Sequence, residues 1–187
     1  MGAISKEELA RNQVQYVSID KDNGGFIFEE KNYPGFEGIF LGINSHEYEF
    51  KGRIQSKLDI FLFDKTIYQL EFGKYSWLAF KLLNQLMSIP PDELQGSNNQ
   101  MRIFLTRKND NLNIFVQWNG EYLKWKYKFD SLKFNSKNED QKISHRNKII
   151  DKWYNYLSEI KMFNPQERKL EATEEDVVVY DDPDLPF

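Results

Sequence analysis

The feature that most constrains the fold is a period-two alternation of apolar and polar residues, repeated in segments that short turns separate. Leu58, Ile60 and Leu62, for example, alternate with Asp59 and Phe61. Successive side chains of a β-strand point to opposite faces, so this pattern predicts half-buried strands. The segments that show it are 46–54, 58–63, 66–72, 101–106, 112–118 and 122–129. A further hairpin is predicted from 14–20 and 26–30 around Asp22-Asn23-Gly24-Gly25.

The alternation gives way to helical spacing in two places. Residues 77–87 follow the N-cap candidate Ser76 and end before Pro90-Pro91, and residues 143–162 form an amphipathic stretch that ends at Asn164-Pro165. A short helix at 6–13 and a loop at 92–100 are also predicted. Strands that flank one helix predict a mainly β fold, a five-stranded OB-type antiparallel barrel with an inserted helix, an amphipathic C-terminal helix and an acidic tail. A mixed α+β sheet is the competing fold.

The charge is divided unevenly along the chain. The net charge is −4, yet residues 171–187 contain seven acidic residues and no Lys or Arg, which leaves 1–170 with 25 basic and 22 acidic residues. We therefore expect an N-terminal arm at 1–13, a binding domain at 14–165 and an acidic tail at 166–187. A basic body with an acidic end is a hint of nucleic-acid binding, and the alternative is a solvated tail that aids solubility.

Several classes of protein are disfavoured by what the sequence lacks. With no cysteine, and with His46 and His145 far apart, neither a metal nor another cofactor is expected. No apolar run is long enough to span a membrane, and the first residues do not resemble a signal peptide, so a cytoplasmic protein is expected. No catalytic motif is present, and we expect no enzymatic activity.

Binding of single-stranded nucleic acid requires cations for phosphates and exposed rings on which bases stack. If Met101, Ile103 and Leu105 face the core, Phe104 points outward, and the same argument holds for Phe115. Large apolar side chains are usually buried, and base stacking would explain rings that point outward. For residues 124–129, the alternative is that the aromatic rings face the core and the lysines face solvent. The candidate DNA-binding residues are Lys51, Arg53, Phe61, Arg102, Phe104, Arg107, Phe115, Tyr122, Lys124, Lys126 and Lys128.

The strongest signal is the C-terminal tip. The terminal Phe187 offers an aromatic ring and an α-carboxylate on one residue, and the preceding acids steer it toward a basic surface. The candidate partner-binding residues are Asp181, Asp182, Asp184, Leu185, Pro186 and Phe187. They resemble the acidic tip of bacterial single-stranded DNA-binding proteins, and phage proteins of this kind also combine an OB barrel with such a tail. Pro183 interrupts the acidic run and departs from that pattern.

The resemblance implies a sequence-independent single-stranded DNA-binding protein of DNA replication, recombination and repair. Its tip would recruit a polymerase, a helicase or primase, or recombination factors, in the bacterial cytoplasm or in a phage-infected cell. The short link between body and tip and the lack of zinc ligands are departures, so tetramerisation is not implied. Two alternatives stay open. One is an adaptor or decoy that docks into tip-binding pockets without binding DNA, and the other is a polymerase or nuclease accessory that prefers duplex DNA.

Overall fold

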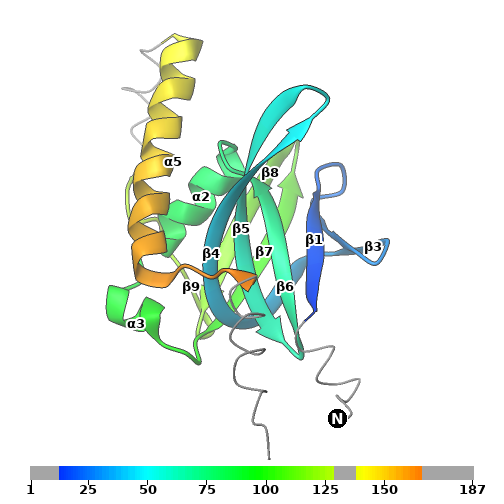
Figure 1. The fold of residues 1–187 in the computed structure, drawn as a ribbon, viewed down its shortest axis with the longest axis vertical. Coiled ribbons are helices and arrows are strands. Elements are labelled where there is room, and N and C mark those ends of the chain that lie inside the picture. The colour runs from blue at the N-terminus through cyan, green and yellow to red at the C-terminus, as the bar shows by residue number, and fades with distance from the viewer. Residues whose placement is uncertain (1–12, 129–137, 166–187) are drawn as a thin grey trace, which may run out of the picture.

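One large β-sheet dominates the computed structural model, which describes residues 13–128 and 138–165 (Figure 1). The strands are β1 (Val14–Asp20), β2 (Gly25–Phe28), β3 (Lys31–Tyr33), β4 (Gly35–Phe50), β5 (Arg53–Asp64), β6 (Thr66–Gly73), β7 (Gln100–Lys108), β8 (Asn111–Trp118) and β9 (Glu121–Tyr122). The helices are α2 (Trp77–Leu86), α3 (Pro91–Gln95) and α5 (Glu139–Lys161). None of these helices is long and apolar enough to cross a membrane.

The nine strands lie in the order β3-β2-β1-β6-β5-β4-β7-β8-β9. All neighbours are antiparallel except β1 and β6, which are parallel. The expected mainly β class is confirmed, but the closed five-stranded barrel is wrong. Extra strands extend the sheet at both ends, and its edge strands β3 and β9 are not paired with each other.

The open sheet is nevertheless strongly curled. The Arg107 side chain, near the end of β7, donates Nη1 hydrogen bonds to the carbonyls of Lys21 and Asp22 in the β1–β2 turn, at 2.8 and 2.6 Å. Gly24 lies so close that an added Cβ would be 2.7 Å from the Cβ of Arg107. Contacts between distant strands therefore give the sheet an inner, core-facing side and an outer side.

The inner side holds the hydrophobic core. Leu58, Ile60 and Leu62 of β5 are fully buried, as the alternation predicts, and so are the inward residues of β7. Helix α2 packs against this side at β8 and β6, and α5 packs on α2. The rings of Phe80 and Trp153 join the two helices at a centroid distance of 5.0 Å. Helix α2 therefore covers the inner side of the sheet, and α5 stands beside the sheet along α2 (Figure 1).

The helix predictions are mostly confirmed. Ser76 caps α2, since its hydroxyl accepts a hydrogen bond from the backbone N–H of Ala79 at 3.1 Å. Helix α5 begins earlier than predicted because Asn138 and Gln141 form a capping box. The predicted loop at 92–100 is wrong in its first part, where Pro91 begins the short α3. The predicted helix at 6–13 lies outside the described residues.

Two predicted strands end earlier than the alternation indicates. The segment 46–54 is interrupted by a tight turn at Lys51-Gly52, where both residues have positive φ, so β4 and β5 form a hairpin. The segment 122–129 remains in the sheet only as far as Tyr122. In both cases the period-two pattern continues beyond the strand, so the pattern alone does not locate the strand end.

Candidate nucleic-acid interface

Three aromatic side chains lie together on the outer side of β7, β8 and β9. Phe104 of β7 is directly opposite Phe115 of β8, and Tyr122 of β9 is opposite Gln117 of β8. The ring centroids of Phe104 and Tyr122 are 6.4 Å apart. We call Phe104, Phe115 and Tyr122 the aromatic strip. The prediction that Phe104 and Phe115 share an outward face is confirmed by this register.

The strip is accessible although its residues are large and apolar. Phe115 is 44% exposed and Tyr122 is 62% exposed, while Phe104 is half-buried. Gly35 of β4, opposite Phe104, makes room for that ring, because a Cβ at Gly35 would lie 2.9 Å from the Phe104 Cδ1 atom. The sheet therefore supports the ring of Phe104 from one side and leaves the strip open to solvent.

Arg102 provides positive charge directly beside the strip. Its guanidinium lies 5.7 Å from the centroid of the Phe104 ring and forms an ion pair with Glu37 of β4. A hollow of about 160 Å³ lies beside it, with Glu37 and Gln117 among its lining residues. A cation next to exposed rings is the combination on which single-stranded nucleic acids bind, although Glu37 must release Arg102 for a phosphate contact.

Phe61 does not belong to this interface. Its side chain does point to the outer side, but it is only 1% exposed. Met162, just after α5, forms a bridge to Ile43 of β4, and the next residue, Phe163, places its ring 4.9 Å from that of Phe61. Gly42 permits this crossing, because its φ is +150° and an added Cβ would lie 2.9 Å from Phe163 Cβ. The prediction of Phe61 as an exposed stacking residue is wrong because a distant segment covers it.

Lys124, Lys126 and Lys128 do not line the sheet face either. The chain leaves the sheet after Tyr122, and residues 123–128 cross to the helices. Both backbone groups of Tyr127 bond to the side-chain amide of Asn84 in α2, each at 2.9 Å. The three lysines are exposed and lie beyond the last strand of the sheet, and Lys126 lines a cavity between the helices. The predicted phosphate track beside Tyr122 is therefore wrong for these residues.

Arg107 has a structural role. Besides its two hydrogen bonds to the β1–β2 turn, its Nη2 atom lies 3.5 Å from Asp110 Oδ1. The guanidinium thus satisfies carbonyls of a neighbouring turn, and this role accounts for its position without a ligand.

Lys51 and Arg53 lie at the tip of the β4–β5 hairpin. Residues 48–55 pair only within this hairpin, because the pairing of β5 with β6 begins at Lys57. Tyr48 and Phe50 are 37% and 50% exposed there, and Lys51 Nζ lies 5.2 Å from the Phe50 ring centroid. Neither ring is among the residues predicted to bind DNA; the Lys51-Gly52 turn is the sequence signal that could have revealed a projecting hairpin.

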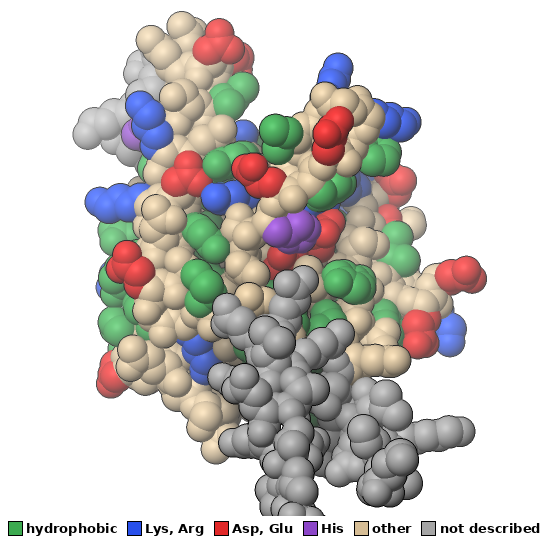
Figure 2. All heavy atoms as spheres, viewed as in Figure 1, with side chains coloured by type: hydrophobic (Ala, Val, Ile, Leu, Met, Phe, Trp, Pro, Cys, Tyr) green, Lys and Arg blue, Asp and Glu red, His purple; other side chains and the backbone are tan. Residues whose placement is uncertain are grey.

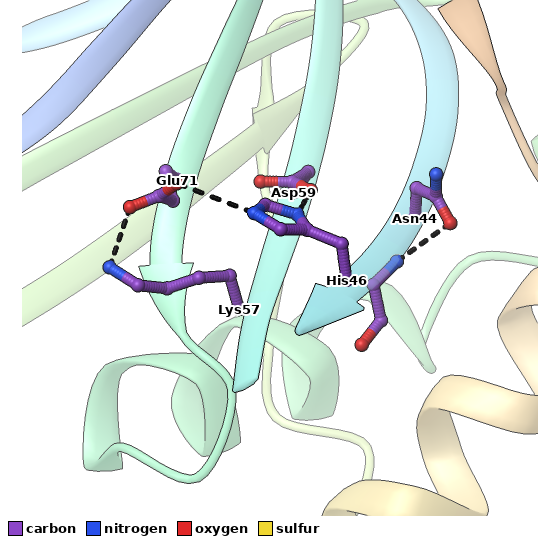
Figure 3. Close-up of polar contacts among 6 residues, drawn as sticks. Asn44, His46, Lys57, Asp59 and Glu71 are labelled. Atoms are coloured by element: carbon purple, nitrogen blue, oxygen red, sulfur yellow. Dashed lines mark hydrogen bonds and ion pairs between the residues drawn. The ribbon is translucent and has the colours of Figure 1, made fainter. Parts of the chain in front are cut away.

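A polar cluster lies at the base of this hairpin (Figure 3). His46 Nδ1 is 2.7 Å from Asp59 Oδ2, and its Nε2 is 3.8 Å from Glu71, which also bonds to Lys57 at 2.6 Å. Asp59 is 1% exposed. Burial raises the pKa of Asp59, and hydrogen bonds from Gln69 and His46 oppose this rise only in part. The cluster joins β4, β5 and β6 beneath the hairpin.

The same side of the molecule is mixed in charge. Figure 2 shows acidic side chains beside a histidine near the middle of the visible face, with few basic ones around them. Within residues 13–128 and 138–165, no three His, Cys, Asp or Glu side chains are grouped closely enough to hold a metal ion. This region is therefore a weaker candidate for binding phosphates than the aromatic strip.

The tip residues Asp181–Phe187 lie outside the described residues. Comparison with known proteins adds no assignment, because no protein-family model, curated protein or solved structure matches this chain.

Proposed function

We propose that the protein binds single-stranded DNA without sequence preference on the aromatic strip and recruits replication proteins through its acidic tip. The observation that carries the proposal is the cross-strand pair Phe104 and Phe115, which faces solvent beside Tyr122. Rings in this arrangement offer stacking surfaces to successive bases, and stacking contributes about 1–3 kcal/mol per base. Every base has a flat face, so this mode of binding tolerates any sequence.

The polar surroundings of the strip support the same function. Arg102 lies beside the rings, and Thr106 and Gln117 share their face through the register of β7 and β8. These side chains donate hydrogen bonds that phosphates and base edges can accept. The projecting hairpin, with Lys51 and Arg53 next to Tyr48 and Phe50, offers a second combination of cations and rings.

The role in DNA replication, recombination and repair rests on the tip. A terminal ring with its α-carboxylate can fill an apolar pocket while a cation at the rim meets the carboxylate, which suits a polymerase, a helicase or primase, or a recombination factor with such a pocket. No catalytic step is proposed, and the protein acts by binding.

The proposal is tested by titrating the full chain with fluorescent oligo-dT at low and high salt, with duplex DNA as competitor. We expect binding that weakens with salt, with a log–log slope of about −0.7 for each phosphate contacted, and little competition from the duplex. Absence of binding at both salt concentrations would favour the adaptor that only docks its tip. A duplex that competes equally would favour the polymerase or nuclease accessory.

A further inference from the structure

A cavity of about 760 Å³ lies on the helical side of the molecule. It is bordered by the end of α2, the start of α3, the segment 123–128 and α5. Its lining is mainly apolar and includes Met87, Ile89, Tyr127, Ile149, Trp153 and Tyr156. This volume is within the range of small-ligand pockets, about 300–1,000 Å³.

Aromatic rings form one wall of this cavity. Tyr127 stacks on Trp153 with a centroid distance of 5.5 Å and an interplanar angle of 9°. Trp153 is 7% exposed, whereas Tyr127 and Tyr156 are 46% and 42% exposed. The cavity thus has a fixed inner ring and two accessible rings, which suits the insertion of another aromatic side chain.

The charged residues that line the cavity are both lysines, Lys126 and Lys152. Both are exposed, and within the part of the chain that the structure describes neither forms an ion pair. The acids Asp92 and Glu93 follow Pro91 on α3 but do not line the cavity. An apolar cavity with two unpaired ammonium groups is complementary to an apolar ligand that carries negative charge.

We propose that this cavity binds the C-terminal tip of the same chain, Asp181–Phe187. The Phe187 ring enters the apolar part, and its α-carboxylate and the carboxylate of Asp184 meet Lys126 and Lys152. No other segment of the chain combines a terminal aromatic ring, its carboxylate and a run of acids. The tip therefore has the chemistry that the cavity selects.

The reach of the tail permits this docking. The described part ends at Pro165, and the 22 residues 166–187 that follow span at most about 75 Å when extended. The cavity lies along α5, whose 23 residues measure about 35 Å in total. Because the tether is short, the tip is present at an effective concentration in the millimolar range, which favours docking within one molecule.

Docking at this cavity would regulate recruitment without blocking DNA. None of the residues that line the cavity belongs to a strand, whereas the aromatic strip is on the outer side of β7, β8 and β9. A partner protein would have to displace the tip from the cavity before binding it. The docking itself does not depend on the proposed DNA binding, whereas its effect on recruitment rests on the proposed function of the tip.

The test uses a fluorescein-labelled peptide with the sequence of residues 181–187 and measures its anisotropy with two proteins, the full chain and a chain that ends at residue 180. We expect the peptide to bind the shortened chain and to bind the full chain at least about tenfold more weakly, because the tethered tip competes. Equal binding to both proteins, or no binding to the shortened chain, would overturn the proposal.

Charge reversal locates the site. In the shortened chain, Lys126→Glu with Lys152→Glu should weaken peptide binding about tenfold. The matched control, Lys124→Glu with Lys148→Glu, changes exposed lysines of the same two segments that do not line the cavity and should leave binding unchanged. Equal effects of the two pairs would overturn the proposal. They would mean that the attraction is nonspecific, or that another segment such as 129–137 fills the cavity. Oligo-dT binding of the same proteins reports separately on the proposed function.

Discussion

Two regions of the outer side of the sheet carry outward-pointing phenylalanines, and only one of them is open. On β7 and β8, Phe104 and Phe115 face solvent beside Tyr122. On β5, Phe61 points to the same side of the sheet but lies beneath the ring of Phe163. The alternation treats these three phenylalanines alike, because it reports the face of the sheet on which a side chain lies.

The difference arises from what lies over each region. The segment that follows α5 pairs with β4 at Ile43 and covers Phe61, although it is about a hundred residues away in sequence. Beyond β7, β8 pairs with the two-residue strand β9 and is hydrogen-bonded to Gln85 of α2. Neither covers Phe115, whose side chain is 44% exposed. An outward aromatic is thus a binding candidate only when no distant segment covers it.

The largest expected effect comes from removing the open rings. Phe104→Ala combined with Phe115→Ala should weaken oligo-dT binding by about 2–6 kcal/mol, since each ring supports one base. Fluorescence anisotropy titrations measure this loss. Tyr16→Ala, which removes a 70% exposed ring on β1, is the matched control and should leave affinity unchanged. Unaltered affinity of the double variant would reject the strip as the stacking surface.

The covered phenylalanine should behave in the opposite way. Phe61→Ala should lower the free energy of unfolding by about 3–5 kcal/mol, because it leaves a cavity beneath Phe163. Urea unfolding measures the loss, and oligo-dT affinity of the folded protein should not change. Phe163→Ala, from the other side of the contact, should lower stability in the same direction. If Phe61→Ala weakened DNA binding without loss of stability, the contrast between the two regions would fail.

The two arginines of β7 extend the comparison to charge. Arg102→Gln should weaken oligo-dT binding several-fold and reduce the magnitude of the log–log salt slope by about 0.7, as expected for one lost phosphate contact. Arg107→Gln should instead lower stability and leave the slope unchanged, because its guanidinium holds the β1–β2 turn. Titrations at four salt concentrations distinguish them, and equal slopes for both variants would contradict the assignment.

The smallest effect is expected on the helical side. Lys124→Ala combined with Lys128→Ala should leave oligo-dT affinity within about twofold of the unmodified protein, because lone exposed charges away from the interface act weakly through salt-containing water. The same titration measures it. A loss of affinity comparable to that of Arg102→Gln would indicate that the 124–128 segment belongs to the DNA interface.

Local patterns predicted much of this fold. The alternation correctly placed Leu58, Ile60 and Leu62 in the core, and Ser76 correctly marked the start of α2. The β7–β8 face, including Phe104 and Phe115, followed from the same rule. These features depend on neighbours in sequence, and local periodicity describes such neighbours well.

The errors that affect the site concern contacts between distant segments. The parallel pairing of β1 with β6 and the cover over Phe61 involve residues far apart, which no local pattern encodes. The 124–128 run alternates like a strand, yet its rings pack on helices: Trp125 contacts Phe80, and Tyr127 stacks on Trp153. An alternating pattern therefore predicts two-faced segments, and the tertiary contacts decide what each face meets.

The most direct test of where bases stack is photocrosslinking of the full chain to oligo-dT that contains 5-iododeoxyuridine, followed by mass spectrometry of the crosslinked peptides. This nucleotide reacts with aromatic side chains in contact with the base. We expect crosslinks at Phe104, Phe115 or Tyr122 and none at Phe61. Crosslinks found only outside residues 100–122 would contradict the assignment of single-stranded DNA binding to the aromatic strip.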